Sequence, residues 1–330
     1  MPTQVACQRH ISLEAQLCGS FNATVPVETQ TKPEASPPGR NRVAYIILAH
    51  QRPESVARLV RRPYAADHGF FIHYDLNRSA ADFQQLVTEF ATVPNVYFLK
   101  RHKCRWGNAG IVMGMLEGIA ELARQKFIYD YAIQLSGQDY PIKSDAEIRG
   151  QLTMAAGRSF MESTSWPMPD WENGRAIKRI ENYHLHLPVP PWLRKLGWQP
   201  MWQHLTIPMK RKIPGDLHPH FGSAFWCLHR SCLKWIHDYV TEHPEYVRFF
   251  QPALLPEECF FQTLLMNSPF AASMVGRTLT DIVWRPPWPG IMTMADLPRL
   301  QQSDCLFARK FDPAVDAKIM ETFDSRHATG

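Results

Sequence analysis

The sequence predicts an α/β fold in which a mostly parallel central sheet is flanked by helices on both faces. In the first half of the chain, short apolar runs of strand length alternate with helical patterns. The apolar runs are continuous, as in strands that are buried on both faces. Polar residues follow the ends of several runs, where open α/β sheets bind their ligands.

The first expected strand, Val43–Ala49, is followed by Pro53, which can open a helix because its missing N–H costs nothing there. The next strand, Phe70–Asp75, precedes a helix that returns the chain to a third strand. His50, Asp75 and the loop after Leu135 follow strand ends, so we expect them at one edge of the sheet. The elements expected here are strands 43–49, 70–75, 96–99 and 131–135 and helices 53–62, 80–90 and 111–122.

The second half is less regular. Its candidate elements are strands at 180–187, 223–228 and 279–284, a strand or turn at 306–311, and helices through 233–240, from Pro256 and after Pro313. Residues 1–41 lack sustained periodicity and are rich in polar residues and Pro toward their end, which is typical of a flexible tail. We expect residues 42–330 to form a single domain.

The composition is that of an ordinary globular protein, with 330 residues, 45% hydrophobic and 20% charged. A formal net charge of +5 permits an anionic substrate and does not argue for nucleic acid. We find no apolar run of about 18 residues and no signal peptide, so we expect no membrane-spanning helix. The seven scattered cysteines indicate reduced thiols rather than a zinc site.

The stretch Leu254–Leu265 contains the strongest candidate for catalysis. Pro256 fits the first position of a helix, which places Glu257 and Glu258 in its first turn. Phe261 and Leu265 follow Glu258 on the same face, so its carboxylate heads an apolar stripe. Apolar surroundings would raise the pKa of Glu258, as a general base needs, whereas the helix N-terminus would lower it. Acidic residues in a first turn can also serve the helix dipole alone.

Four further motifs combine polar residues with tight turns. They are Leu135-Ser-Gly-Gln-Asp139-Tyr-Pro141, His73-Tyr-Asp75-Leu-Asn77, His220-Phe-Gly222-Ser223 and Leu306-Phe-Ala-Arg309-Lys310. Each could instead be a capped turn, a core strand or a solvated surface pair. Asp75 and Asn77 supply one carboxylate and one amide, which is a poor set for a hard cation. The pairs His184/His186 and His218/His220 lack a carboxylate partner at a recognisable spacing, so we expect no metal.

The region from Pro188 to Pro214 mixes tryptophans with basic residues. It could be an acceptor groove, a patch that lies on an anionic membrane, or an irregular packed loop. The side chains concerned are Trp192, Trp198, Trp202, Arg194, Lys195, Lys210, Arg211 and Lys212.

Pro256-Glu-Glu-Cys-Phe-Phe-Gln-Thr263 and the four motifs occur in the order found in the core-2/I-branching N-acetylglucosaminyltransferases and the peptide O-xylosyltransferases, which this chain resembles over about residues 42–325. The xylosyltransferase branch is the closer match. The resemblance implies a GT-A-like fold and makes Glu258 the catalytic base. It places Asp139 near the donor sugar, Asp75 near the nucleoside and Lys310 on the phosphates.

Other roles are implied by looser matches. Arg309, Arg285, His50, Trp106, Gly222 and Ser223 would line the donor site, and Glu162, Arg175 and Lys178 the acceptor site, with Arg179 continuing that region. Residues 42–157 would form the nucleotide-sugar half, and residues 158–330 the acceptor and catalytic-base half.

The resemblance therefore implies an inverting, metal-independent transfer of N-acetylglucosamine or xylose from a UDP-sugar to a glycan, glycolipid or protein hydroxyl. The UDP-sugar would be the donor substrate, and we expect no cofactor. Because the chain lacks the anchor of the animal members, we expect a cytoplasmic, bacterial-type protein able to lie on the inner face of the membrane. Two alternatives are a metal-dependent nucleotide-sugar enzyme of another family and a catalytically silent sugar-binding or membrane-associated protein.

Overall fold

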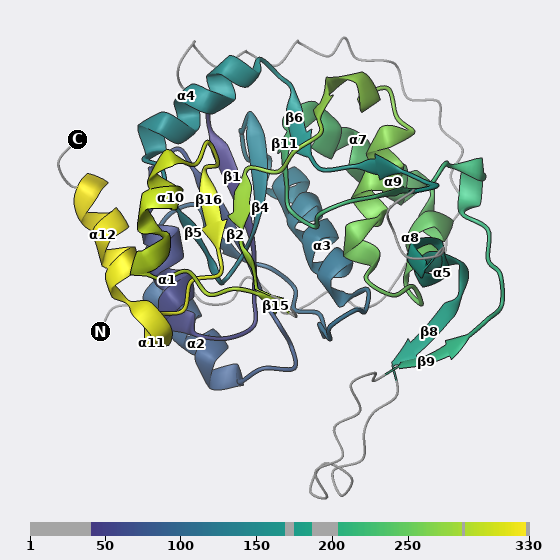
Figure 1. The fold of residues 1–330 in the computed structure, drawn as a ribbon, viewed down its shortest axis with the longest axis horizontal. Coiled ribbons are helices and arrows are strands. Elements are labelled where there is room, and N and C mark those ends of the chain that lie inside the picture. Colours follow the sequence, from purple (N-terminus) through teal and green to yellow (C-terminus); the bar gives the residue numbers. More distant parts are fainter. Residues whose placement is uncertain (1–40, 169–174, 187–203, 286–287, 328–330) are drawn as a thin grey trace, which may run out of the picture. The chain divides into compact units, whose positions relative to one another are not determined.

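The computed structural model describes residues 41–168, 175–186, 204–285 and 288–327. It confirms the predicted α/β class: a seven-stranded sheet in the order β12-β6-β11-β4-β1-β2-β3 has helices on both faces (Figure 1). Most neighbouring strands are parallel, and only β11 runs antiparallel to its two neighbours. The strands are β1 Val43–Ala49, β2 Gly69–Tyr74, β3 Val96–Phe98, β4 Tyr131–Ser136, β6 Ser159–Met161, β11 Trp226–His229 and β12 Met274–Val275.

The two faces of the sheet are buried in two separate apolar cores, because successive strand residues point to opposite sides. In β1, Ala44 and Ile46 face one core, and Tyr45 and Ile47 face the other. The first core is covered by α3 Gly110–Gln125, α5 Arg175–Glu181, α7 Arg230–Glu242, α8 Pro244–Phe250 and α9 Phe260–Met266. The second is covered by α1 Pro53–Arg61, α2 Ala80–Glu89 and α4 Asp145–Ala155.

A three-stranded sheet forms beside the main one from segments far apart in the sequence. Its order is β13-β16-β5, with β13 Thr280–Ile282, β16 Phe307–Arg309 and β5 Asp139–Pro141. A third apolar core lies between this sheet and the helices α10 Leu297–Gln302 and α12 Lys318–His327, which the short helix α11 Pro313–Asp316 precedes. Three further pairs of strands are β7 Thr164–Ser165 with β10 His220–Phe221, β8 Tyr183–His186 with β9 His204–Ile207, and β14 Trp284–Arg285 with β15 Trp288–Pro289.

The elements of the first half are confirmed to within a few residues, whereas several in the second half are wrong in part. The strand predicted at 180–187 starts only at Tyr183, because the preceding residues end α5. The strand predicted at 223–228 starts at Trp226, and the helix predicted from Pro256 is split into a short 3-10 turn and α9. The strand predicted at 279–284 is interrupted, and α8 was not predicted.

Two predicted regions fall outside the described residues. They are residues 1–40 of the expected tail, and Trp192, Trp198, Trp202, Arg194 and Lys195 of the expected aromatic and basic region. Among the helices that the structure describes, none is both long enough and apolar enough to cross a membrane.

The contact between β1 and α3 gives a direct test of the fold. Ile46 is fully buried, and a Cβ atom on Gly118 would lie 2.7 Å from its Cγ2 atom. We expect Ile46→Ala to lower the free energy of unfolding by about 2–5 kcal/mol, because it leaves a cavity in a close contact. The exposed Ile128 is the control: its alanine variant should change stability by less than about 0.5 kcal/mol. Equal urea midpoints for both variants would contradict this packing.

Candidate active site at the carboxyl ends of the strands

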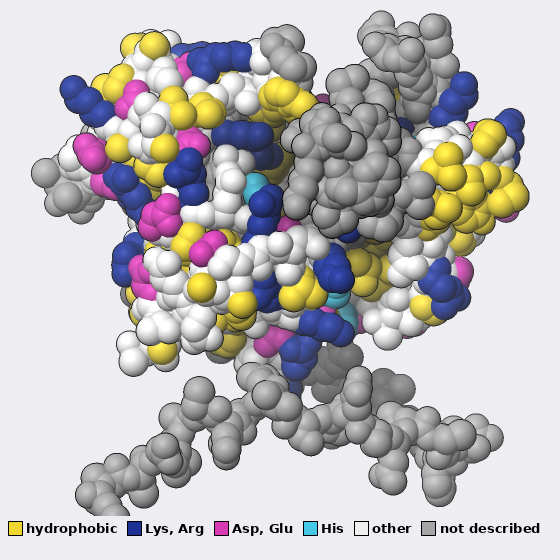
Figure 2. Space-filling view, turned by 90° about the horizontal axis from the view of Figure 1, so that it is seen from below, with side chains coloured by type: hydrophobic (Ala, Val, Ile, Leu, Met, Phe, Trp, Pro, Cys, Tyr) yellow, Lys and Arg dark blue, Asp and Glu magenta, His cyan; other side chains and the backbone are white. Residues whose placement is uncertain are grey.

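The carboxyl ends of β1, β2 and β4 lie at one edge of the main sheet, because these strands are parallel neighbours. This edge is at the lower side of Figure 1, which Figure 2 faces. Figure 2 shows several Lys and Arg side chains in the middle of this surface, with His among them. The edge therefore offers positive charge where α/β sheets bind ligands.

Asp75 is buried directly after β2 and is held by N–H groups. Its Oδ1 accepts hydrogen bonds from the backbone N–H of Asn77 at 2.9 Å, the amide of Asn77 at 3.1 Å and the backbone N–H of Cys104 at 3.0 Å. Its Oδ2 lies 3.8 Å from the guanidinium of Arg78. The amide of Asn77 is thus a donor to Asp75, so these two side chains form a fixed turn.

Asp139 and Arg309 form a buried ion pair across the β5–β16 ladder, where they are register partners. The Nε of Arg309 lies 3.4 Å from Oδ1 of Asp139, which also accepts the Ser136 hydroxyl at 2.7 Å. Burial raises the pKa of Asp139, although Arg309 opposes that shift. The guanidinium of Arg309 lies 4.3 Å from the ring centre of Phe225, so the pair is closed in by an aromatic side chain.

Lys310 follows this buried pair and is half-buried. Burial, with the neighbouring Arg309, lowers the pKa of its ammonium group. Lys310 also lies close enough to His50, at the end of β1, to contribute to lowering the pKa of that histidine, whose main cause is burial. Asp75, Arg78 and Arg309 act on His50 as well, which places all these groups in one electrostatic neighbourhood. We call His50, Asp75, Asp139, Arg309 and Lys310 the strand-end cluster.

The segment that carries Glu258 is held by backbone hydrogen bonds rather than by an α-helix. Pro256–Glu258 form a single 3-10 turn, and Cys259, with φ −146°, separates it from α9. Leu255 adopts a left-handed conformation, with φ 51°, and its N–H donates to the carbonyl of Gly107 at 3.0 Å. Glu258 therefore does not sit in the first turn of a long helix, and the dipole effect predicted for it is absent.

The carboxylate of Glu258 faces basic and acidic side chains. Its Oε2 accepts a hydrogen bond from Nη1 of Arg179 at 2.8 Å. Burial raises the pKa of Glu258, Arg179 opposes the shift, and the nearby Glu162 adds to it. About a third of the side chain remains exposed, so a ligand can reach it. Of the two influences predicted from the sequence, burial acts on the pKa of Glu258, and the influence that opposes it is Arg179 instead of a helix N-terminus.

Gly222 joins the backbones of Glu162 and Glu258. Its N–H donates to the carbonyl of Glu258 at 2.8 Å. A Cβ atom at this position would lie only 2.0 Å from the carbonyl oxygen of Glu162, so no side chain fits without moving the backbone. Residues 222–225, which begin at this contact, lie outside any strand. Glu162, Arg179, Gly222, Glu257 and Glu258 make up what we call the base cluster.

Two contacts join the base cluster to the strand-end cluster. In the loop after β3, the backbone N–H of Cys104 donates to the carboxylate of Asp75, and the carbonyl of Gly107 accepts a hydrogen bond from the N–H of Leu255. These two loop residues are three positions apart, which limits their Cα separation to about 11 Å. In addition, Phe225, three residues after Gly222, packs on Arg309. The structure thus brings Glu258 and the strand ends to the same region.

The other predicted residues have different surroundings. Trp106 is in the loop after β3, with 55% of its surface exposed. Ser223 is half-buried, and its backbone carbonyl accepts a hydrogen bond from the side-chain amide of Gln262 at 2.7 Å. Arg285 is bonded to Asp296 at 2.7 Å and packs on Gly290, whose carbonyl accepts the backbone N–H of Lys310 at 3.2 Å. Lys178 is exposed on α5, whereas the side chain of Arg175 lies outside the described residues.

Sequence reasoning did not single out Glu257. It is 6% exposed, and its Oε2 has no hydrogen-bond partner among the described residues. Burial raises its pKa to about 8, and the adjacent Glu258 adds to the shift. The sequence feature that could have drawn attention to Glu257 is its position directly before the candidate base, Glu258.

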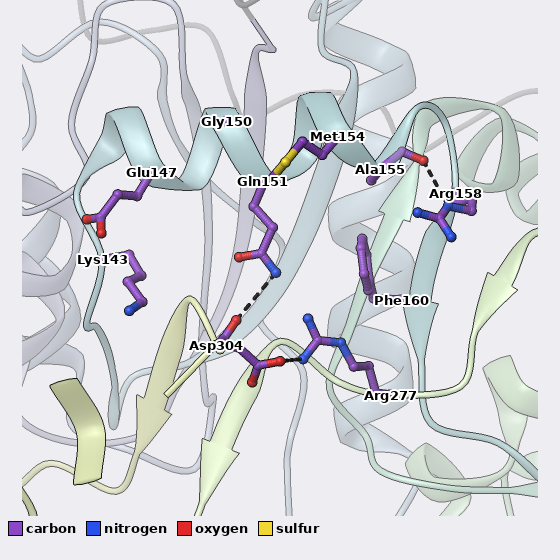
Figure 3. A pocket seen from close by; sticks show the side chains of 10 residues that line it. All are labelled: Lys143, Glu147, Gly150, Gln151, Met154, Ala155, Arg158, Phe160, Arg277 and Asp304. Carbon is purple, nitrogen blue, oxygen red and sulfur yellow. Dashed lines mark hydrogen bonds and ion pairs between the residues drawn. The ribbon is translucent and has the colours of Figure 1, made fainter. Parts of the chain in front are cut away.

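A separate hollow of about 600 Å³ lies under α4 (Figure 3). Its polar side chains largely satisfy one another: Arg277 pairs with Asp304, and Glu147 caps the start of α4. It contains none of the predicted site residues. The lining residues are Lys143, Glu147, Gly150, Gln151, Met154, Ala155, Arg158, Phe160, Arg277 and Asp304.

The part of the chain that the structure describes also bears on metal binding. No group of three or more His, Cys, Asp or Glu side chains there could hold a metal ion.

Comparison with known families gives one match over most of the chain. The family model described as Core-2/I-branching enzyme matches residues 43–302. Similar proteins include mouse xylosyltransferase 2, 27% identical over 96% of this chain and 37% of that protein, and rat xylosyltransferase 1, 26% identical over 88% and 36%. Xylosyltransferase oxt of Drosophila melanogaster is 26% identical over 93% of this chain and 35% of that protein. The chain spans little more than a third of the length of these relatives.

Among solved structures, core-mannan synthase A from Aspergillus fumigatus aligns with 73% of this chain and 74% of that chain. The TM-score is 0.34 at 10% identity, which is too slight a likeness to support a conclusion.

The buried Glu257 predicts a pH-dependent stability. With a pKa of about 8, against an ordinary 4.5, the folded protein keeps a proton that the unfolded chain releases. The contribution of Glu257 to the free energy of unfolding should therefore fall as pH rises from about 4.5 to 8. Glu257→Gln should be more stable than the parent protein at pH 9, and the difference should vanish or reverse at pH 5.

Urea unfolding at pH 5, 7 and 9 measures this effect. The matched control is Glu242→Gln at an exposed helix position, which should keep the parent's pH dependence. An unchanged pH dependence in Glu257→Gln would show that the buried carboxyl group is not the cause.

Proposed function

Because the chain belongs to the Core-2/I-branching enzyme family, we propose that it is an inverting glycosyltransferase that uses a UDP-sugar. The transferred sugar would be N-acetylglucosamine or xylose, and the acceptor a hydroxyl of a glycan, glycolipid or protein. The names of the similar xylosyltransferases support a sugar transfer. The observation that carries the proposal is that the loop from Cys104 to Gly107 joins Asp75 to the segment bearing Glu258.

Glu258 is the proposed general base. The acceptor oxygen attacks the anomeric carbon, its proton passes to the Glu258 carboxylate, and the bond from the anomeric carbon to the UDP oxygen breaks. A base acts best when its pKa lies near the working pH, and burial moves the pKa of Glu258 upward. Arg179, 2.8 Å away, holds the carboxylate in position and favours its ionised form.

Lys310 is proposed to bind the departing diphosphate, next to the buried Arg309 that precedes it in the chain. Positive groups fixed at developing negative charge stabilise a transition state without reorganisation. Arg309 is paired with Asp139, so its main effect would be to position Lys310 and the sugar-binding turn. Arg285 is bonded to Asp296, which partly offsets its positive charge.

The proposal includes no metal. A metal on the Asp75 motif would need oxygen ligands from both Asp75 and Asn77. The Asn77 amide instead donates to Asp75, whose Oδ1 already accepts three N–H groups. Asp75 would then meet the nucleoside, Asp139 and Gly222 would border the sugar, and Glu162 and Lys178 would meet the acceptor.

Replacement of the base tests the assignment. We expect Glu258→Gln to lower sugar transfer by about 10²–10⁴-fold, since the amide cannot take the proton. Binding of UDP, measured by calorimetry, should change little because Lys310 and Arg309, which are proposed to hold the diphosphate, are unchanged. Assays with UDP-N-acetylglucosamine and UDP-xylose would first identify the donor. The exposed Glu242→Gln serves as control, and full activity of Glu258→Gln would rule out this base.

The proposed role of Lys310 at the leaving diphosphate gives a second prediction. Lys310→Gln should lower kcat by about 10²-fold, because it removes a positive charge from the developing diphosphate. Activity of the parent protein should survive EDTA. The exposed Lys234→Gln is the matched control. Loss of activity in EDTA, restored by manganese, would overturn the metal-free mechanism and favour a metal-dependent nucleotide-sugar enzyme.

A further inference from the structure

The hairpin of β8 and β9 turns its apolar face to solvent. Leu185 lies directly opposite Leu205, and Tyr183 lies opposite Ile207. Because strand side chains alternate between faces, these four residues share one face. Leu185 is 41% exposed, Leu205 51% and Ile207 37%. Large aliphatic side chains in direct cross-strand pairs are normally the buried side of a hairpin.

The opposite, polar face is fastened to the domain. The backbone N–H of His184 donates to the carbonyl of Pro252 at 2.7 Å. Its buried ring contacts the hydroxyl of Thr206 at 3.0 Å and the carbonyl of Lys178 at 3.2 Å. These bonds attach the hairpin to the domain through the buried His184, whereas Thr206 on the same face is exposed.

Positive charge borders the apolar face. Lys210 and Lys212 are exposed just beyond β9, together with Met209, which is 54% exposed. Lys212 pairs with Asp216, which leaves Lys210 as the nearer surface cation. Lys178 is exposed on the helix that leads into β8. Toward the right, the side on which Figure 1 places this hairpin, Figure 2 shows hydrophobic side chains gathered in one patch with Lys and Arg nearby.

Arg211 fixes the base of the hairpin. Its guanidinium donates to the carbonyls of Ile180 at 2.6 Å and Asn182 at 3.0 Å, and lies 4.7 Å from the ring centre of Tyr183. Tyr183 is thus covered, whereas Leu185, Leu205 and Ile207 remain available to a partner.

We propose that this outer face, made of Leu185, Leu205 and Ile207 with Met209 and Lys210, docks onto the surface of an anionic membrane. Aliphatic side chains that enter the interface, beside lysines that meet acidic headgroups, are the usual means of peripheral attachment. A stable contact between two proteins needs about 20–30 residues on each side, far more than this narrow face supplies. A bilayer, in contrast, accepts a few projecting side chains.

Sedimentation with lipid vesicles tests the proposal on the full chain. Vesicles of phosphatidylcholine with 30% phosphatidylglycerol should bind the protein, and vesicles of pure phosphatidylcholine should bind it more weakly. Leu185→Asp combined with Leu205→Asp should lower the partition by at least about tenfold, because apolar burial is lost and negative charge is added. Lys210→Gln should lower it less, and high salt should weaken binding of the parent protein.

The control is Ile128→Asp, at a residue that is 60% exposed on another part of the domain. It adds a charge of the same sign and should leave vesicle binding unchanged. Hydrolysis of the UDP-sugar by the double variant should equal that of the parent, since neither leucine belongs to the candidate site.

Several results would overturn the proposal. They are no binding to anionic vesicles, equal binding by the double variant, or binding that ignores lipid charge. A parent protein that sediments as a dimer broken by the leucine substitutions would show that a second copy covers the face. A large fall in melting temperature for the double variant would show that the chain itself covers it.

Discussion

The buried pairing of Arg309 with Asp139 is the constraint on which the candidate site depends. An ion pair in the interior is costly to desolvate, and the loss of one partner would leave an uncompensated charge. Here Asp139 also accepts hydrogen bonds from the backbone N–H and hydroxyl of Ser136, which offset part of that cost. Because the two residues are register partners across β5 and β16, the pair fixes the C-terminal strand against the turn after β4. Lys310, the next residue, is thereby placed near His50.

A second constraint acts on the base cluster through backbone contacts. Gly222 fits between Glu162 and Glu258 only because it has no side chain. Leu255 accepts a left-handed conformation, which is unfavourable for a residue of its kind, and is held there by its bond to Gly107. The orientation of Glu258 thus comes from three loops that meet, and the helix that follows contributes little to it. Such a site can change its acceptor by changing loops while the sheet stays the same.

The hairpin of β8 and β9 differs from the main sheet in the exposure of its aliphatic side chains. In the main sheet, apolar strand residues enter one of two cores, whereas the aliphatic residues of this hairpin are exposed, as are Trp284 and Trp288 of the pair β14 and β15. A stability argument does not explain this arrangement, since exposed aliphatic pairs gain little from folding. The membrane docking that we propose would supply the missing apolar contact.

The sequence alone determined the class of fold, the elements of the first half and the candidate residues. Continuous apolar runs of strand length such as Val43–Ala49 are typical of strands buried on both faces, and a proline such as Pro53 indicates where a helix begins. It did not determine the irregular second half, where Gly222–Phe225 and Pro256–Cys259 depart from their local pattern. Those departures come from contacts between residues far apart in the chain, such as Gly222 with Glu162, and from the pairing of β5 with β16. The contact of Gly222 with Glu162, and the bond of Gly222 to the carbonyl of Glu258, likewise determine the surroundings of Glu258. Local spacing carries no information about such distant contacts, so only the tertiary structure could decide them.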